Sequence, residues 1–245
     1  DYVVVQSYNA YNGEPVTVVL AKALLPTLFN PKAAGLALED YKPGDKLVPF
    51  KVVAEYKGTE LVGMEYEQLI PWVKPVEIAE DGTWKASDKG FRVIQGDYVT
   101  VEDGTGIVHI APTFGADDAY VARAAGIPSL FMINRKGETR PMVDLTGKFY
   151  LLDELDERFV KECVDVDKYG EYQGAWVKNA YDPQFTVDGK FDEKAAQAAE
   201  SLDIVLCMMM KANKQAFKIE KHVHYYPHCW RTDKPVLYYP LDSWF

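Results

Sequence analysis

A histidine and two adjacent aspartates lie close together in residues 103–118, which read DGTGIVHIAPTFGADD. We predict a glycine-rich turn, a strand over 107–110, a loop containing proline and glycine, and then the start of a helix. Side chains alternate along a strand, so His109 faces away from its two neighbours. Because the loop then reverses the chain, His109 and the pair Asp117 and Asp118 are expected to line one cleft.

Two interpretations of this group stay open on the pattern alone. A carboxylate in the first turn of a helix is stabilised by the helix dipole and the free N–H groups, and an ionised carboxylate can bind an ammonium group. Alternatively, Asp117 or Asp118 only caps the helix and His109 is an ordinary core histidine. The turn at 104–106 lacks the spacing of a dinucleotide fingerprint and the lysine of a P-loop, so it predicts no phosphate loop.

A second group contains three histidines and a cysteine, His222, His224, His228 and Cys229. Zinc binds such side chains, but the spacing matches no standard motif and no second ligand cluster occurs elsewhere. We therefore predict no metal site. The alternatives are a metal-binding interaction domain built on this group, or an aromatic-rich strand and turn that packs against a neighbour.

Charge limits the remaining function classes. The chain has 27 basic and 37 acidic residues, a net charge of −10, which does not fit a free-standing nucleic-acid binder. The most basic stretch carries Lys211, Lys214, Lys218 and Lys221; it either contacts a phosphate backbone or is a solvated surface. No nucleophile elbow is present, so a hydrolase here would use a positioned water and the electrostatics of the site.

The elements that must position these residues are mostly strands in the first half of the chain and helices in the second. A hairpin turn is predicted at Asn12-Gly13. The predicted strands are 2–6, 16–20, 47–56, 61–64, 91–95 and 98–102. The predicted helices are 116–125, ending at Gly126; 151–164, with Leu152, Leu155, Phe159 and Cys163 on one face; and 191–202.

This pattern predicts an α+β fold with a barrel-like β core and peripheral helices. We expect one domain over 1–220 and a strand-rich exit segment over 221–245. Hydrophobic residues make up 48% of the chain, enough for a sizeable core. No apolar run is long enough to predict a membrane span. Both ends are expected to be cut from a longer polypeptide.

Three sequence blocks resemble one family. Residues 104–118, GTGIVHIAPTFGADD, are similar to the signature of the editing domain of isoleucyl-tRNA synthetases. The blocks GTELVGMEY at 58–66 and YPHCWRTDKP at 226–235 resemble two further family blocks, in the expected order. Related valine enzymes usually have lysine, and leucine enzymes methionine, at the position of His109. The isoleucine type is therefore favoured over these two alternatives of the same class.

The resemblance implies hydrolysis of valine from mischarged tRNA(Ile), with isoleucine excluded by its size; isoleucyl-tRNA synthetase is the standard example of this double-sieve editing. Asp118 and His109 would be the catalytic-site residues: Asp118 holds the α-ammonium group and His109 helps to set the size limit. The substrate-binding residues would be Thr113, Phe114, Gly115 and Asp117. Water would be the nucleophile.

The resemblance also implies the partners, which are the acceptor end of tRNA(Ile) carrying valine and the rest of the synthetase, in the cytoplasm. No cofactor is expected in these residues. ATP and magnesium belong to the family's catalytic domain, whose HIGH-like and KMSKS-like motifs do not occur here. The family also uses a threonine-rich peptide upstream of the matched blocks, and the chain contains none. The alternative function is therefore a non-catalytic module that docks the tRNA end and is incomplete without that peptide.

Overall fold

The computed structural model describes residues 1–221 and 225–241, and these divide into two compact units. Unit 1 comprises Asp1–Tyr66, Arg92–His109 and Lys211–Ile219. Unit 2 comprises Glu67–Phe91, Ile110–Met210 and the described part of 220–245. Each unit has its own buried core. Because the units interleave along the chain, they do not test the expected division into 1–220 and 221–245, which stays a prediction.

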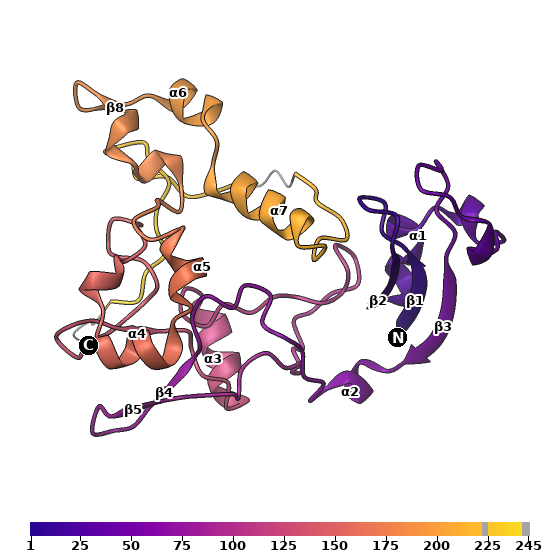
Figure 1. Cartoon of the computed structure of the whole chain (residues 1–245), viewed down its shortest axis with the longest axis horizontal. Helices are drawn as coiled ribbons and strands as arrows, with labels where there is room; N and C mark the ends of the chain where they lie inside the picture. The colour runs from indigo at the N-terminus through magenta and orange to yellow at the C-terminus, as the bar shows by residue number, and fades with distance from the viewer. Residues whose placement is uncertain (222–224, 242–245) are drawn as a thin grey trace. The chain divides into compact units, whose positions relative to one another are not determined.

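Unit 1 is built on a three-stranded antiparallel sheet (Figure 1). Its central strand β1 (Tyr2–Tyr8) pairs with β2 (Pro15–Ala21) on one side and β3 (Lys51–Tyr56) on the other. The predicted hairpin turn at Asn12-Gly13 is confirmed, and Gly13 takes a φ of 73°. The short helices of this unit are η1 (Lys22–Leu24), α1 (Leu25–Leu28), η2 (Pro31–Ala33), η3 (Leu38–Asp40) and α2 (Gly58–Leu61).

The core of unit 1 lies under one face of β1, where Val3 and Val5 are fully buried. Residues 211–219 join this core through Phe217, although they are about 200 positions away in sequence. The side-chain amide of Asn9 donates to the carbonyl of Ala216 at 2.9 Å. Lys214 forms an ion pair with Glu14. The basic stretch is thus partly committed to contacts inside unit 1.

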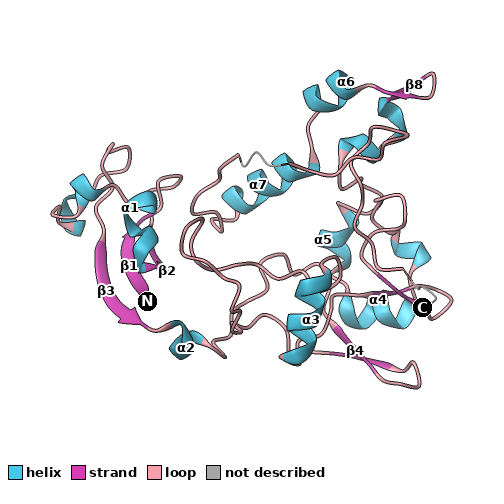
Figure 2. Cartoon of the chain, turned by 180° about the vertical axis from the view of Figure 1, so that it is seen from behind, coloured by secondary structure: helices cyan, strands magenta, loops and turns pink. Residues whose placement is uncertain are grey.

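Unit 2 holds a larger core under short elements joined by long loops, drawn in pink in Figure 2. Met132, Leu155, Phe159 and Tyr169 are fully buried, and Trp72 stacks on Tyr172 with ring centres 4.1 Å apart. Its strands are β4 (Val76–Ile78), β5 (Trp84–Ala86), β6 (Met132–Ile133), β7 (Thr139–Arg140), β8 (Thr186–Val187) and β9 (Lys190–Phe191). Its helices are α3 (Ala116–Ala124), η4 (Leu152–Glu154), α4 (Glu157–Cys163), α5 (Val166–Gly170), η5 (Asn179–Tyr181), η6 (Pro183–Phe185) and α6 (Glu193–Ala198), with α7 (Leu202–Ala212) running on into unit 1.

The helix predicted over 151–164 is interrupted. The carboxylate of Asp156 accepts a hydrogen bond from the N–H of Phe159 at 2.8 Å and so caps α4, which separates it from η4. The predicted apolar face is confirmed, since Leu155, Phe159 and Cys163 are buried and Leu152 is half-buried against the same core. Burial also raises the pKa of the Cys163 thiol.

The strands predicted over 61–64, 91–95 and 98–102 are wrong. Gly58–Leu61 is the helix α2, and only one isolated bridge, between Glu65 and Arg92, connects these segments. Two backbone hydrogen bonds, from Gly63 to Val93 and from Val93 to Met64, hold them together without a ladder. Segments 61–64 and 91–95 therefore contact each other, but they pair over too few residues to form a sheet.

The α+β class is confirmed, because the described residues form one three-stranded and three two-stranded antiparallel sheets together with helices. They form no closed barrel, so the barrel-like β core is not confirmed. Over 1–221 and 225–241, no helix is long and apolar enough to cross a bilayer.

Candidate functional site

The glycine-rich turn at 104–106 docks on the end of β2 in unit 1. The N–H of Ala21 donates to the carbonyl of Thr105 at 2.8 Å, and the Tyr2 hydroxyl donates to the carbonyl of Gly106 at 2.7 Å. Gly106 has a φ of +71°, and a Cβ there would lie 2.5 Å from the Cβ of Ala21. Glycine is therefore required for this close approach, and the turn has a structural role.

His109 follows this turn and ends the segment Arg92–His109 of unit 1. Residues 107–110 are irregular in backbone structure, so the predicted strand is not formed there. The side chain of His109 is exposed. The interpretation of His109 as a buried core histidine is therefore wrong.

The loop and helix that follow belong to unit 2, and Asp118 closes the loop on itself. Its Oδ2 accepts a hydrogen bond from the N–H of Ala111 at 2.9 Å, seven residues earlier. The helix α3 begins after Gly115, which provides no side-chain cap, so neither aspartate acts as the N-cap. Asp117 is exposed, whereas Asp118 is half-buried.

Gly115 gives Asp118 the room for this arrangement. A Cβ at residue 115 would lie 2.9 Å from Oδ2 and 3.0 Å from Cγ of Asp118. Any side chain at residue 115 would therefore displace the carboxylate or the loop. Gly115 belongs to the site because it lets the Asp118 carboxylate fold back over the loop.

Thr113 and Phe114 anchor the same loop to the body of unit 2. Thr113 is 7% exposed, and its hydroxyl donates to the carbonyl of Leu130 at 3.0 Å. Phe114 packs against the core of unit 2, and its ring lies edge-on to that of Tyr239 with ring centres 6.5 Å apart. Both side chains thus hold the loop in place. Their expected role as a wall of the substrate site stays a prediction.

This arrangement offers one half-buried carboxylate to a cation. One oxygen of Asp118 is oriented by a backbone N–H, and no residue in the described part of the chain donates to the other. Its place in the first turn of α3 favours the negative charge. Because His109 belongs to unit 1 and the loop to unit 2, the cleft shared by His109 and Asp118 stays a prediction.

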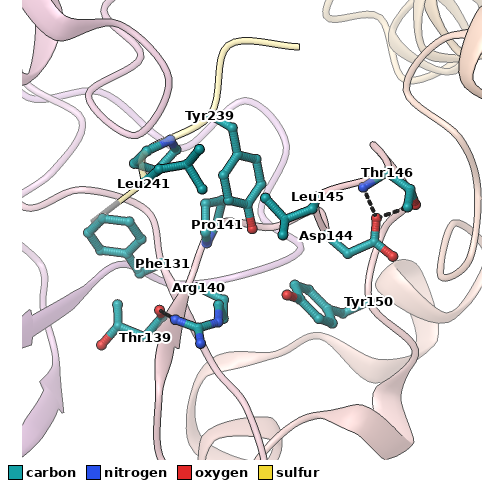
Figure 3. A pocket seen from close by; sticks show the side chains of 11 residues that line it. Phe131, Thr139, Arg140, Pro141, Asp144, Leu145, Thr146, Tyr150, Tyr239 and Leu241 are labelled. Atoms are coloured by element: carbon teal, nitrogen blue, oxygen red, sulfur yellow. Dashed lines mark hydrogen bonds between the residues drawn. The ribbon is translucent and has the colours of Figure 1, made fainter. Parts of the chain in front are cut away.

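No sequence pattern indicates the open pocket of about 700 Å³ that lies in unit 2 (Figure 3). Its lining comes from three separate segments: Phe131; Thr139, Arg140, Pro141, Asp144, Leu145, Thr146 and Tyr150; and Tyr239, Pro240 and Leu241. Burial raises the pKa of Tyr150 and of Tyr239, and the Tyr239 hydroxyl donates to the carbonyl of Val143 at 3.0 Å. No spacing pattern joins segments about 100 residues apart, although the turn after Asp144 is visible in the sequence as D-L-T-G.

The expected absence of a metal site is not tested. Residues 1–221 and 225–241 contain no group of three or more potential ligands, but His222 and His224 lie outside the described residues. Of the other two members, His228 donates from Nδ1 to the carbonyl of Asp233 at 2.8 Å. Hydrogen bonds, the strongest from Thr232, lower the pKa of the Cys229 thiol.

Comparison with known proteins gives the class. No protein-family model matches the chain. The chain is 86% identical over its full length to isoleucine–tRNA ligase of Bacteroides thetaiotaomicron, and covers 21% of that protein. It is 54% identical over its full length to the enzyme of Porphyromonas gingivalis, covering 20% of it. It is 36% identical over 96% of its length to the enzyme of Clostridium acetobutylicum, covering 15% of it.

These relatives are aminoacyl-tRNA synthetases. Within this class, the chain belongs to the isoleucine–tRNA ligase family. The family resemblance read from the three sequence blocks is thus confirmed. The chain spans about a fifth of the length of the Bacteroides and Porphyromonas relatives that it matches.

Proposed function

We propose that this chain is the region of an isoleucine–tRNA ligase that hydrolyses valine from mischarged tRNA(Ile). The observation that carries the proposal is the half-buried carboxylate of Asp118, oriented at 2.9 Å by the N–H of Ala111 and held by an anchored loop. A carboxylate fixed in this way binds the α-ammonium group that every aminoacyl-tRNA carries. Membership of the family supports the proposal, since the substrate of such a site is a product of a tRNA ligase.

The reaction is an ester hydrolysis. Water adds to the carbonyl carbon of the aminoacyl ester, the bond to the ribose oxygen breaks, and that oxygen leaves with a proton. Asp118 holds the ammonium group, which fixes the carbonyl relative to the water. Hydrolysis in this form needs no cofactor bound to these 245 residues. The site would act inside a cytoplasmic ligase whose remaining parts bind most of the tRNA.

His109 is proposed to set the upper size limit of the amino acid side chain. Attraction alone distinguishes isoleucine from valine by only about 1–3 kcal/mol for the extra methylene, so a site that accepts the smaller side chain must exclude the larger one sterically. In His109→Ala of the full-length ligase, we expect isoleucyl-tRNA(Ile) to be hydrolysed. If it stays intact while valyl-tRNA(Ile) is still cleared, His109 has no part in the size limit.

The test of Asp118 removes its charge and keeps its hydrogen bond. In Asp118→Asn the amide oxygen still accepts from Ala111, so the loop is retained. We expect the full-length ligase with Asp118→Asn to hydrolyse valyl-tRNA(Ile) at least about 30-fold more slowly, since losing one member of a buried charge pair costs about 2–5 kcal/mol. Asp203→Asn is the matched control, because Asp203 is exposed in the first turn of α7. Normal clearance by Asp118→Asn would contradict the proposal.

The alternative of a non-catalytic docking module is separated by the same assay. It predicts that the ligase binds valyl-tRNA(Ile) through this region but that Asp118→Asn leaves its hydrolysis unchanged.

A further inference from the structure

Two strands of the unit 1 sheet hold the glycine-rich turn at 104–106. The Tyr2 hydroxyl, from β1, donates to the carbonyl of Gly106 at 2.7 Å. The N–H of Ala21, at the end of β2, donates to the carbonyl of Thr105 at 2.8 Å. Gly106 is itself buried. Two adjacent carbonyls of the turn are therefore fixed by distant groups, 104 positions away in the case of Tyr2.

The side chain of Tyr2 is firmly placed by its surroundings. Its backbone pairs with Ala21 of β2 on one side and with Tyr56 of β3 on the other. Its ring packs against the core of unit 1 and lies beside Gly58, where a Cβ would come within 3.0 Å of the ring. A hydroxyl on a ring held in this way has little freedom. The position of Tyr2 therefore determines that of Gly106, to which it is bonded.

The short stretch from the turn to His109 has little support of its own. Ile107 and Val108 are 49% and 50% exposed, and the backbone over 107–110 is irregular. Three residues span no more than about 11 Å even when fully extended. The position of Gly106 therefore limits where His109 can lie.

From this arrangement we infer that Tyr2 is a positioning residue for the size limit of the site. Its hydroxyl fixes the turn, and the turn fixes His109. The inference rests on the proposed function, which assigns the size limit to His109. A side chain that excludes a single methylene by steric contact must be held to within about 0.5 Å. Releasing the turn should therefore admit isoleucine although His109 is still present.

The first test, Tyr2→Phe, removes the hydroxyl and keeps the ring. A methylene is worth about 10–200-fold in discrimination, so in the full-length ligase we expect hydrolysis of isoleucyl-tRNA(Ile) to be at least about fivefold faster. Hydrolysis of valyl-tRNA(Ile) should change by less than about twofold, since valine already fits.

Tyr8→Phe is the matched control for Tyr2→Phe. Tyr8 lies at the other end of β1, and its half-buried hydroxyl also donates to a loop carbonyl, that of Leu38 at 2.8 Å. A general loss of stability would act alike in both variants. Equal ratios of the two hydrolysis rates in Tyr2→Phe and Tyr8→Phe would overturn the inference.

The second test, Gly106→Ala, displaces the turn by steric contact, since the new Cβ would lie 2.5 Å from the Cβ of Ala21. We expect hydrolysis of isoleucyl-tRNA(Ile) to rise about tenfold, the lower end of the range for a methylene. Gly104→Ala is the control. Gly104 has a φ of +64° and Gly106 one of +71°, so alanine is strained at both, but a Cβ at Gly104 meets no atom within 4 Å.

A double variant separates the positioning of His109 from a merely structural role. If Tyr2 acts through His109, then Tyr2→Phe should not raise the hydrolysis of isoleucyl-tRNA(Ile) any further in His109→Ala. An effect of the same size in both backgrounds would overturn the inference.

Amide hydrogen exchange gives a measurement that does not depend on hydrolysis. Because the N–H of Ala21 donates to the turn, peptides containing Ala21 should exchange faster in Gly106→Ala than in Gly104→Ala. Equal exchange in the two variants would show that the turn is not displaced and would overturn the inference.

Failure of the inference and failure of the proposed function give different results. If His109→Ala admits isoleucyl-tRNA(Ile) while Tyr2→Phe and Gly106→Ala discriminate as the unaltered ligase does, His109 keeps its proposed role and the inference is overturned. If His109→Ala itself leaves isoleucyl-tRNA(Ile) intact, the proposed role of His109 is wrong, and the inference falls with it.

Discussion

The two units position their residues by different means. In unit 1, β1 pairs with β2 along all seven of its residues, and backbone hydrogen bonds fix the register of each side chain. In unit 2, the described strands are two or three residues long. A core of aromatic and aliphatic side chains and a few side-chain-to-backbone hydrogen bonds hold its loops instead. The candidate carboxylate, Asp118, depends on the second kind of support.

The largest expected effect on stability comes from creating a cavity in the core of unit 2. Phe159 is fully buried and its ring meets that of Trp84 at 5.7 Å. Phe159→Ala should lower the free energy of unfolding of unit 2 by about 3–5 kcal/mol. Val5→Ala, also at a fully buried position, should cost unit 1 about 2 kcal/mol. Amide hydrogen exchange reports the two units separately. Equal losses of protection in both units from either variant would contradict their separate cores.

A smaller effect is expected at the anchor of the Asp118 loop. Thr113→Val keeps the shape of the side chain but leaves the Leu130 carbonyl without its partner, which should cost about 1–3 kcal/mol. Thr113→Ser retains the hydroxyl and serves as the control. Chemical denaturation measures both. If the two variants are equally stable, the hydrogen bond does not anchor the loop.

The smallest expected effect on stability, but a clear one on activity, comes from filling the space beside Asp118. In Gly115→Ala the new Cβ displaces the carboxylate, so hydrolysis of valyl-tRNA(Ile) should slow by at least about tenfold, or about 1.4 kcal/mol in the barrier. Gly35→Ala is the control, because a Cβ at Gly35 meets no atom within 4 Å. Equal rates in the two variants would show that Asp118 needs no such room.

Sequence reasoning succeeded where local chemistry decides the structure. The Asn12-Gly13 hairpin and the helix ending before Gly126 follow from turn and cap residues, and both are present. The interruption at Asp156 could have been read from its own capping chemistry. The predicted strands at 91–102 failed because a strand needs a partner, and a single sequence does not give pairing partners.

The candidate site likewise has features that the local sequence predicts and features that depend on the fold. Asp118 is indicated from the sequence by its place in the first turn of a predicted helix and by the family resemblance. The bond to Ala111 and the room left by Gly115 depend on how the loop folds back, which no spacing rule predicts. The pocket was missed entirely, since Arg140 and Tyr239 are brought together only by the core of unit 2.

The most direct test of the proposed editing function compares the hydrolysis of two esters by one enzyme. The full-length ligase would be given valyl-tRNA(Ile) and isoleucyl-tRNA(Ile) side by side, without ATP, and the release of each amino acid followed. We predict rapid hydrolysis of the valine ester, slow hydrolysis of the isoleucine ester, and loss of the fast reaction in Asp118→Asn. Equal rates for the two esters, or an undiminished rate in Asp118→Asn, would contradict the assignment of editing to this region.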